Sequence, residues 1–211
     1  MSTSLVRDIA CPNCGEAHPL NIYTSINIAD NPELKERVLD ESIFDYQCED
    51  CGYMAEITYP LVYHDPKAGY MILLLNQGQE FEGVDVPSAL DNVVKRRVES
   101  LAELKEKILI FDAGCSDVAV ELVKNALRGI ITKTYQTDEV DCYFSRKAED
   151  GSLEFAIFIR SSNEPVYHST KSEVYEQSSE ILRTIGYEEE NSFIMVNRDF
   201  ADALLEEYKG S

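Results

Sequence analysis

Two cysteine pairs constrain this chain more than any other feature of its sequence. Cys11 and Cys14 form one CxxC turn, Cys48 and Cys51 form the other, and a glycine follows each pair. A CxxC turn presents two sulfurs to one metal ion, and structural Zn²⁺ takes four ligands in a tetrahedron. The spacing therefore predicts a zinc ribbon in which all four cysteines bind the metal.

The residues around the pairs fit this interpretation. Gly15 and Gly52 can adopt positive φ, which lets backbone N–H groups point at the sulfurs, and Pro12 stiffens the first turn. The 33 residues between the pairs form a long insertion that must fold back to bring the two turns together. We expect a helix at 31–39 to do this.

The identity and role of the metal follow from the ligand set. Tetrahedral sulfur coordination suits iron as well as zinc, and a Cys-Pro-x-Cys-Gly turn also occurs in rubredoxin-type centres, so iron stays open as the less favoured metal. A shell of four cysteines leaves no position for water, which disfavours hydrolytic zinc chemistry. We therefore expect structural Zn²⁺ and no catalytic residues.

Composition and cysteine usage predict a cytoplasmic protein. Of the 211 residues, 44% are apolar and 27% are charged, which is typical of a globular chain. The longest apolar run, 71–75, is far shorter than the roughly 18 residues of a membrane span, and the first ten residues carry no apolar signal segment. In a reducing compartment, six cysteines favour metal over disulfides.

Net charge makes nucleic acid an unlikely partner. The chain carries −20 overall, distributed as −8 over 1–75, −2 over 76–133 and −10 over 134–211, and binding to phosphate depends on Lys and Arg. The basic cluster of the chain is Lys95-Arg96-Arg97. We expect it on the solvated face of a helix rather than on a phosphate-binding surface.

The first block is predicted to be mainly β-structure. A strand at 23–28 precedes the helix at 31–39, whose start carries Pro32 and an acidic residue. Alternating apolar and polar residues at 53–62, a turn at 64–69 and a strand at 70–76 predict a β-hairpin that grows out of the metal site.

The second block is predicted to be helical. A capping box at 88–91 opens a helix, and Ser100 with Glu103 offers a second cap that would split it. A further helix begins after Ser116 and stops at Gly129. The apolar stripe of the first helix consists of Leu90, Val94, Leu101, Leu104 and Ile108.

The third block mixes strands and helices and completes an α+β fold. Its predicted elements are strands at 142–145 and 154–160 around a turn at 149–152, a helix at 172–185 ended by Gly186, a strand at 193–196 and a last helix capped by Asn197.

The histidines lack convincing partners. His18 follows the first cysteine pair and is interpreted as a surface residue rather than a ligand. His64 beside Asp65 resembles a base with its orienting acid, yet adjacent side chains rarely aim at each other. His168 has no neighbour that suggests chemistry.

The two cysteines outside the pairs also favour a structural interpretation. Cys115 and Cys142 have no partner nearby in the sequence. Isolated cysteines of this kind behave as small buried apolar residues more often than as nucleophiles.

Several stretches resemble the CpXC domain, a bacterial and archaeal domain named for its cysteine motif. The resemblance covers about residues 8–130, and the family's four cysteines fall on Cys11, Cys14, Cys48 and Cys51. It implies a metal site and no particular reaction, substrate or partner. The matching stretches are Cys11-Pro-Asn-Cys14-Gly15, Ser25-Ile-Asn27, Pro32-Glu-Leu34, Phe44, Cys48-Glu-Asp-Cys51-Gly52, Tyr59-Pro-Leu-Val-Tyr63-His-Asp65, Glu103 to Ile108 and Val120-Glu-Leu122.

The expected organisation is a zinc-ribbon domain with a helical extension over 1–135 and an acidic α+β region over 136–211. The expected function is a non-catalytic protein-interaction or adaptor module with an unidentified protein partner and no membrane association. One alternative is a zinc-ribbon nucleic-acid-binding or transcription-associated factor that uses the 95–97 cluster. The other is a redox or metal-dependent enzyme, which needs an exchangeable site that the sequence does not supply.

Overall fold

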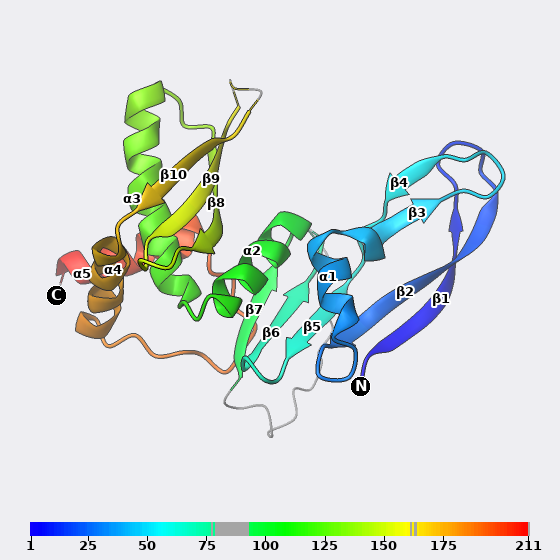
Figure 1. The fold of residues 1–211 in the computed structure, drawn as a ribbon, viewed down its shortest axis with the longest axis horizontal. Helices are drawn as coiled ribbons and strands as arrows, with labels where there is room; N and C mark the ends of the chain where they lie inside the picture. The colour runs from blue at the N-terminus through cyan, green and yellow to red at the C-terminus, as the bar shows by residue number, and fades with distance from the viewer. Residues whose placement is uncertain (77, 79–92, 161, 163, 211) are drawn as a thin grey trace. The chain divides into compact units, whose positions relative to one another are not determined.

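The fold is α+β, as the sequence predicted, and the described part of the chain contains three sheets (Figure 1). The structure is a computed structural model that describes residues 1–76, 78, 93–160, 162 and 164–210. Within these residues, no helix is long and apolar enough to cross a membrane.

The chain forms two compact units. Unit 1 comprises Met1–Lys105 with Glu190–Ile194, and unit 2 comprises Glu106–Glu189 with Met195–Ser211. The division between the units falls inside helix α2 (Leu101–Asp112). The predicted domain boundary at 135 lies instead at the end of the following helix, α3 (Asp117–Tyr135).

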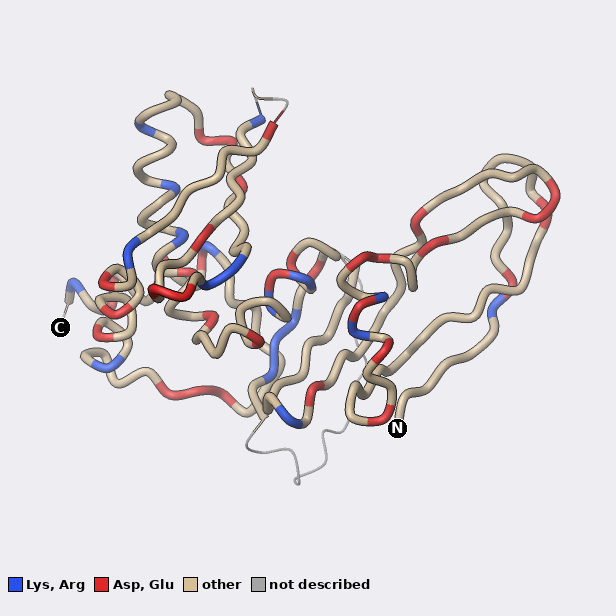
Figure 2. The backbone as a smooth tube through the Cα atoms, viewed as in Figure 1, with Lys and Arg blue, Asp and Glu red and all other residues tan. Residues whose placement is uncertain are grey.

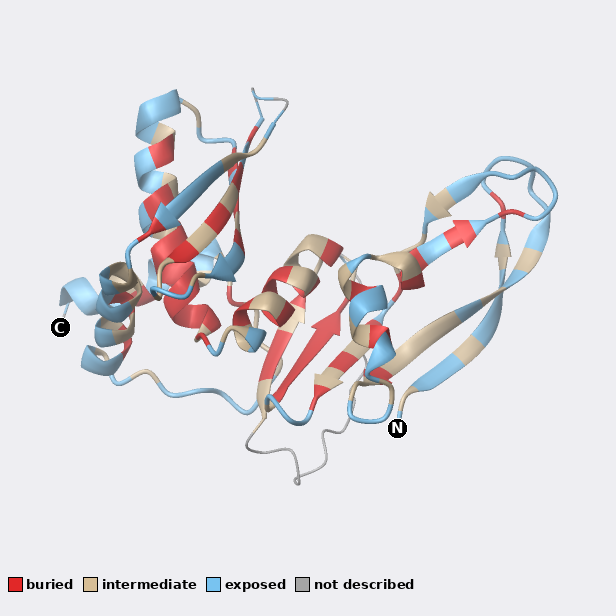
Figure 3. Cartoon of the chain, viewed as in Figure 1, coloured by how far each residue is buried: buried red, intermediate tan, exposed pale blue. Residues whose placement is uncertain are grey.

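Unit 1 is built on a five-stranded sheet with the order β1-β2-β5-β6-β7. The strands are β1 (Thr3–Ala10), β2 (Ala17–Asn27), β5 (Leu61–Asp65), β6 (Tyr70–Leu74) and β7 (Val94–Val98). β1–β2 and β5–β6 are antiparallel pairs, while β2–β5 and β6–β7 are parallel. Every residue of β6 is buried (Figure 3), which explains its continuous apolar sequence.

The predicted β-hairpin over 53–76 is confirmed only in its second half. β5 and β6 pair antiparallel across a turn in which Asp65 Oδ1 accepts N–H bonds from Lys67 and Ala68, both at 3.0 Å. The first half of that segment forms the separate strand β4 (Met54–Glu56), which pairs with β3 (Asp45–Gln47). The β5–β6 hairpin therefore does not grow out of the cysteine turns.

Helix α1 (Glu33–Leu39) confirms the predicted helical insertion. Leu34 and Val38 share its buried face. A short 3-10 helix, η1 (Ser42–Phe44), follows and leads into β3. The Phe44 ring packs against Tyr59 at 5.1 Å, and the Tyr59 hydroxyl donates to the Ile43 carbonyl at 3.0 Å.

The basic cluster at 95–97 lies in β7, so the predicted solvated helix is wrong there. Lys95 and Arg96 are 0% exposed. The Lys95 amine donates to the Val93 carbonyl at 3.3 Å and to the side chain of Asn191, and Arg96 Nη1 donates to the Lys95 carbonyl at 2.9 Å. Burial is tolerated because the charged groups find polar partners.

The second predicted cap of that block is confirmed, because α2 begins directly after Ser100. The Glu103 N–H donates to Ser100 Oγ at 3.2 Å, and the Glu103 carboxylate accepts the Glu99 N–H at 2.7 Å. The capping box at 88–91 and Leu90 lie outside the described residues.

Unit 2 packs helices against a three-stranded antiparallel sheet with the order β10-β9-β8. Its strands are β8 (Val140–Lys147), β9 (Leu153–Ile159) and β10 (Val166–Thr170), and its helices include α3 (Asp117–Tyr135), α4 (Ser172–Thr184) and α5 (Arg198–Gly210). The strands at β8 and β9 and the helices at α4 and α5 are as predicted, whereas β10 was not predicted. The strand expected at 193–196 is a single bridge between Ile194 and Arg96.

Helix α3 confirms one predicted boundary and corrects the other. The Ser116 hydroxyl accepts the Ala119 N–H at 3.3 Å and caps the helix as expected. The helix passes through Gly129 and ends at Gln136, which adopts φ +53°. A glycine inside a helix costs only about 1 kcal/mol. Burial of Ile131 beyond it in the apolar core offsets this cost.

A buried charge network stabilises the free edge of β8. Lys124 contacts Glu106 and Glu121, each at 2.8 Å, and the other Glu106 oxygen accepts the Phe144 N–H at 2.6 Å. Although burial alone lowers the pKa of Lys124, the two carboxylates raise it above its ordinary value. The lysine is therefore charged, and its burial is compensated by ion pairs.

The core of unit 2 predicts a sharp contrast between two aromatic substitutions. Phe155→Ala removes a 0% exposed ring from β9 and is expected to lower the free energy of unfolding by about 3–5 kcal/mol. Tyr167→Ala on β10 removes a ring that is 74% exposed and serves as the control. Urea denaturation measures both, and equal losses would contradict the assignment of this core.

Candidate metal centre

The first cysteine turn forms the tip of the β1–β2 hairpin. The Gly15 N–H donates to the Cys11 carbonyl at 2.9 Å, and the Cys11 N–H donates to the Glu16 carbonyl at 2.8 Å. Gly15 adopts φ +81°, as its place after the pair predicted. The Asn13 N–H points at Cys11 Sγ, 3.4 Å away. We call residues 11–15 the first knuckle.

The second turn repeats this geometry between β3 and β4. The Gly52 N–H donates to the Cys48 carbonyl at 3.0 Å, and the Cys48 N–H donates to the Tyr53 carbonyl at 2.8 Å. Gly52 adopts φ +70°. We call residues 48–52 the second knuckle. Two hairpins, rather than the single predicted one, thus carry the cysteines, and their tips lie side by side (Figure 1).

The four sulfurs converge across the two knuckles. Cys11 Sγ lies 3.7 Å from Cys51 Sγ, Cys14 Sγ lies 3.6 Å from Cys48 Sγ, and all four atoms lie within 4.8 Å of one another. A tetrahedral ion with Zn–S bonds of about 2.3 Å requires sulfurs about 3.8 Å apart. None of the four forms a disulfide. The cluster therefore fits a single tetrahedral metal ion.

The two knuckles contribute one buried and one exposed cysteine each. Cys11 and Cys48 are 3% and 1% exposed and pack with Tyr46, while Cys14 and Cys51 face solvent. Ile9 and Leu20 of the first hairpin pack against this small cluster, as do Ala55 and Ile57 of the second. Among the residues that the structure describes, three are buried in this cluster, so apolar packing alone holds the two tips together weakly.

Polar contacts between the knuckles surround the sulfurs. Asn13 Nδ2 donates to Cys51 Sγ at 3.4 Å, and His18 Nε2 lies 2.8 Å from Asp50 Oδ2. His18 was predicted to be a surface residue, but its side chain is only 15% exposed. Together with Cys48 and Asp50, it forms a second group whose potential ligand atoms lie within 4.8 Å. No sequence pattern links His18 to Asp50, because they are brought together by the fold of the two hairpins.

The local environment makes the four thiols electrostatically unequal. The pKa of Cys51 is lowered to about 6 by the Asn13 side-chain amide and by the Tyr53 N–H. The Glu16 N–H lowers the pKa of Cys14, but desolvation and the neighbouring thiols outweigh it and raise that pKa to about 12. A divalent cation would remove this imbalance, because coordinating thiols are deprotonated outright.

The cysteines outside the knuckles are confirmed as buried packing residues. Cys115 and Cys142 are 5% and 2% exposed and lie in the apolar core of unit 2. Burial raises the pKa of both thiols, that of Cys142 to about 12. Neither has the low pKa and accessibility of a nucleophile.

His64 and Asp65 do not form a catalytic pair. They are consecutive residues of β5, so their side chains point to opposite faces of the sheet. The Asp65 carboxylate is engaged by the turn amides described above, and desolvation lowers the pKa of His64. His168 is exposed on β10.

Two hairpins whose tips bring four cysteines within ligating distance define a metal-binding, zinc-ribbon-like module. The model of the CpXC protein family matches residues 9–124, which is more than half of the chain and includes all four cysteines. The chain belongs to the CpXC protein family. No curated protein and no solved structure matches it.

The contact between Asn13 and the second knuckle generates a test of the site. Asn13→Ala removes an N–H donor to a sulfur, and the loss of such outer contacts lowers metal affinity by about 10–100-fold. The control is Asn21→Ala, an exposed asparagine on β2. Competition with a zinc chelator measures both. Equal Zn²⁺ affinity in the two variants would show that the Asn13 amide does not support the centre.

Proposed function

We propose that this protein is a non-catalytic protein-interaction module in which Cys11, Cys14, Cys48 and Cys51 hold a structural Zn²⁺ ion. The observation that carries the proposal is the convergence of four sulfurs from two hairpin tips, with spacings that suit tetrahedral coordination. The reducing cytoplasm, where thiols remain available to metal, is the compartment that fits this site.

A structural role for the metal follows from the size of the elements that it joins. β3 and β4 contain three residues each and form a sheet of their own. An isolated two-stranded hairpin is marginally stable in water. Coordination of structural Zn²⁺ contributes on the order of 10 kcal/mol to the folding of such small units. Zinc is preferred to iron because a purely structural site needs no redox chemistry.

The absence of catalysis is inferred from the saturated ligand shell. Four cysteine ligands leave the ion no open position at which to activate water or bind a substrate. Among the described residues, the cysteines and histidines outside the knuckles also lack the geometry of a nucleophile with its base. A redox or hydrolytic enzyme is accordingly disfavoured.

A protein partner is inferred from the surface beside the second knuckle. Tyr53 and Met54 directly follow that knuckle and are 39% and 70% exposed. Exposed apolar side chains on a rigid support favour contact with another protein, and aromatic residues and Met are enriched at such interfaces.

The burial of the basic cluster at 95–97 argues against the nucleic-acid alternative. Its basic cluster at 95–97 lies in a strand with two of the three side chains fully buried. Figure 2 shows acidic residues at the hairpin tips, where Glu16, Glu49 and Asp50 accompany the cysteines. Acidic side chains at this position repel phosphate.

Substitution of one ligand tests the structural role of the metal. Cys11→Ser is expected to reduce the zinc content from one ion per chain to a small residual and to increase hydrogen exchange throughout β3–β4 and the tip of β1–β2, because one ligand of four is lost. Elemental analysis and hydrogen exchange measure the two effects. Cys115→Ala, which removes a thiol from unit 2, is the control. Unchanged protection of both hairpins in Cys11→Ser would contradict a structural metal.

The interaction role is tested by altering the exposed surface without touching the metal. Met54→Glu places a charge on a 70% exposed side chain and should retain zinc while weakening recovery of specific partners from native cell extract. Quantitative mass spectrometry compares it with wild type and with Lys209→Glu, a charge change on α5. An identical partner set for all three would count against this surface. Salt-sensitive binding to DNA or RNA by wild type would support the nucleic-acid alternative instead.

A further inference from the structure

A second set of ligand atoms lies directly beside the four cysteines. His18 on β2 and, in the second knuckle, Cys48 and Asp50 each bring one potential ligand atom to within 4.8 Å of the others. Cys48 belongs to both sets, so the two sets share one sulfur. An ion held by the second set is therefore bound next to the ion held by the cysteines.

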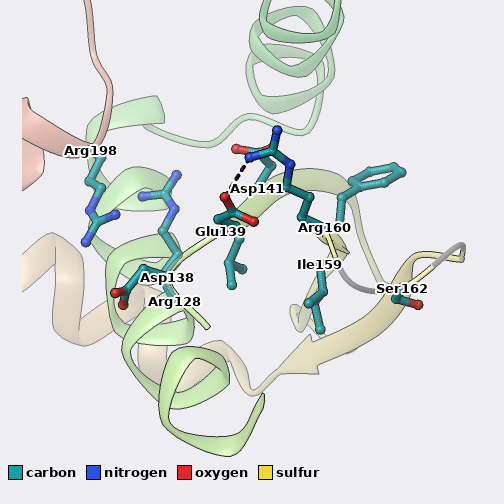
Figure 4. Close-up of a pocket in the computed structure, with 10 residues that line it drawn as sticks. Arg128, Asp138, Glu139, Asp141, Ile159, Arg160, Ser162 and Arg198 are labelled. Carbon is teal, nitrogen blue, oxygen red and sulfur yellow. Dashed lines mark hydrogen bonds and ion pairs between the residues drawn. The ribbon is translucent and has the colours of Figure 1, made fainter. Parts of the chain in front are cut away.

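A cavity in unit 2 lacks such convergence. It encloses about 530 Å³ and is lined by charged residues from several segments, but their side chains spread in different directions (Figure 4). Arg160 pairs with Glu139 at 2.6 Å, while Arg128 and Asp138 lie at the opposite end. The set that contains His18 instead gathers its ligand atoms around one point.

The fold holds the imidazole and the thiol of this set away from water. The His18 side chain is 15% exposed and Cys48 is 1% exposed, whereas 56% of the Asp50 side chain faces solvent. His18 Nε2 lies 2.8 Å from Asp50 Oδ2, yet this nitrogen is buried without a well-aligned hydrogen bond from the described residues. A buried nitrogen and a buried sulfur thus face an opening beside Asp50.

The geometry accommodates a transition-metal ion with little movement. Zn–N and Zn–O bonds of about 2.0–2.2 Å in a tetrahedron place the nitrogen and the oxygen about 3.4 Å apart. The contact between His18 Nε2 and Asp50 Oδ2 therefore has to widen by roughly half an ångström, which the exposed carboxylate permits. The Cys48 thiolate can take part as well, because a thiolate bound to one metal ion keeps lone pairs for another.

The local charge favours a second cation. Four thiolates around one divalent ion leave a net negative charge on the site. The stretches 11–18 and 45–56 add five acidic residues and contain no Lys or Arg, and Figure 2 shows acidic residues at the hairpin tips. A divalent cation bound by Cys48 and Asp50 compensates this excess of negative charge.

The donor atoms select the class of ion. Thiolate and imidazole ligands favour Zn²⁺ and similar transition metals over Mg²⁺ and Ca²⁺, which take oxygen ligands. Three protein ligands also leave one coordination position open, in contrast to the shell of four cysteines. An ion in the second set is therefore expected to exchange more readily than the structural ion.

We propose, on the basis of the structural Zn²⁺ ion proposed above, that His18, Cys48 and Asp50 bind a second, exchangeable Zn²⁺ ion. The Cys48 thiolate bridges the two ions. The second ion binds more weakly, because it has three protein ligands and shares one of them. Protein purified without added metal therefore contains one ion, and the second site fills as the concentration of free Zn²⁺ rises.

Zinc loading of the full-length protein tests the second site. Elemental analysis after dialysis against chelator-buffered Zn²⁺ should show a rise from one ion per chain to two as free Zn²⁺ increases, and X-ray absorption of the two-ion form should show added nitrogen and oxygen ligands. His18→Ala and Asp50→Asn should keep the first ion and weaken the second by roughly tenfold or more. The control is His168→Ala, which removes an exposed histidine from β10.

The outcomes distinguish the second site from the structural one. The proposal is overturned if wild type stays at one sulfur-bound ion at saturating Zn²⁺, since the contact between His18 and Asp50 is then an ion pair only. It is also overturned if both variants take up the second ion like wild type, which would indicate adventitious binding. The four-cysteine site stands in either case, whereas wild type without a sulfur-bound ion would overturn both sites.

Discussion

The convergence of four sulfurs is the constraint on which the two hairpin tips of unit 1 depend. Cys11 and Cys14 come from one hairpin tip, and Cys48 and Cys51 come from another. Among the described residues, the buried members of the apolar cluster around them are Tyr46, Cys11 and Cys48. So small a cluster cannot offset the entropy of ordering two hairpin tips. The four sulfurs lie close enough to hold a metal ion, and the Asn13 amide donates a hydrogen bond to one of them, Cys51 Sγ.

Unit 2 does not depend on a metal site in this way. It has an apolar core between α3 and the sheet, and it places Glu106, Glu121 and Lys124 in a buried network at the edge of β8. Because Glu106 also accepts a strand N–H, the network both satisfies the free edge and compensates the buried lysine.

The sequence predicted the cysteine cluster better than the topology around it. The CxxC spacing and the two positive-φ glycines depend on local geometry alone, so they were predictable, as were the caps at Ser116 and Asn197. The 95–97 strand was mistaken for a helix because apolar residues at helical spacing flank it, and its burial depends on Asn191, which is distant in the sequence. The pairing of His18 with Asp50 escaped prediction for the same reason, since partners of this kind are set by tertiary structure.

The central claim is that the four cysteines form a closed shell around one Zn²⁺ ion. X-ray absorption at the zinc edge of protein purified without added metal tests this most directly, because it reports the identity of the metal, the type of ligand and the bond length together. The account predicts zinc with four sulfur ligands at about 2.3 Å and no nitrogen or oxygen ligand. Protein that contains no zinc, or a shell with a nitrogen or oxygen ligand in place of one sulfur, would contradict it.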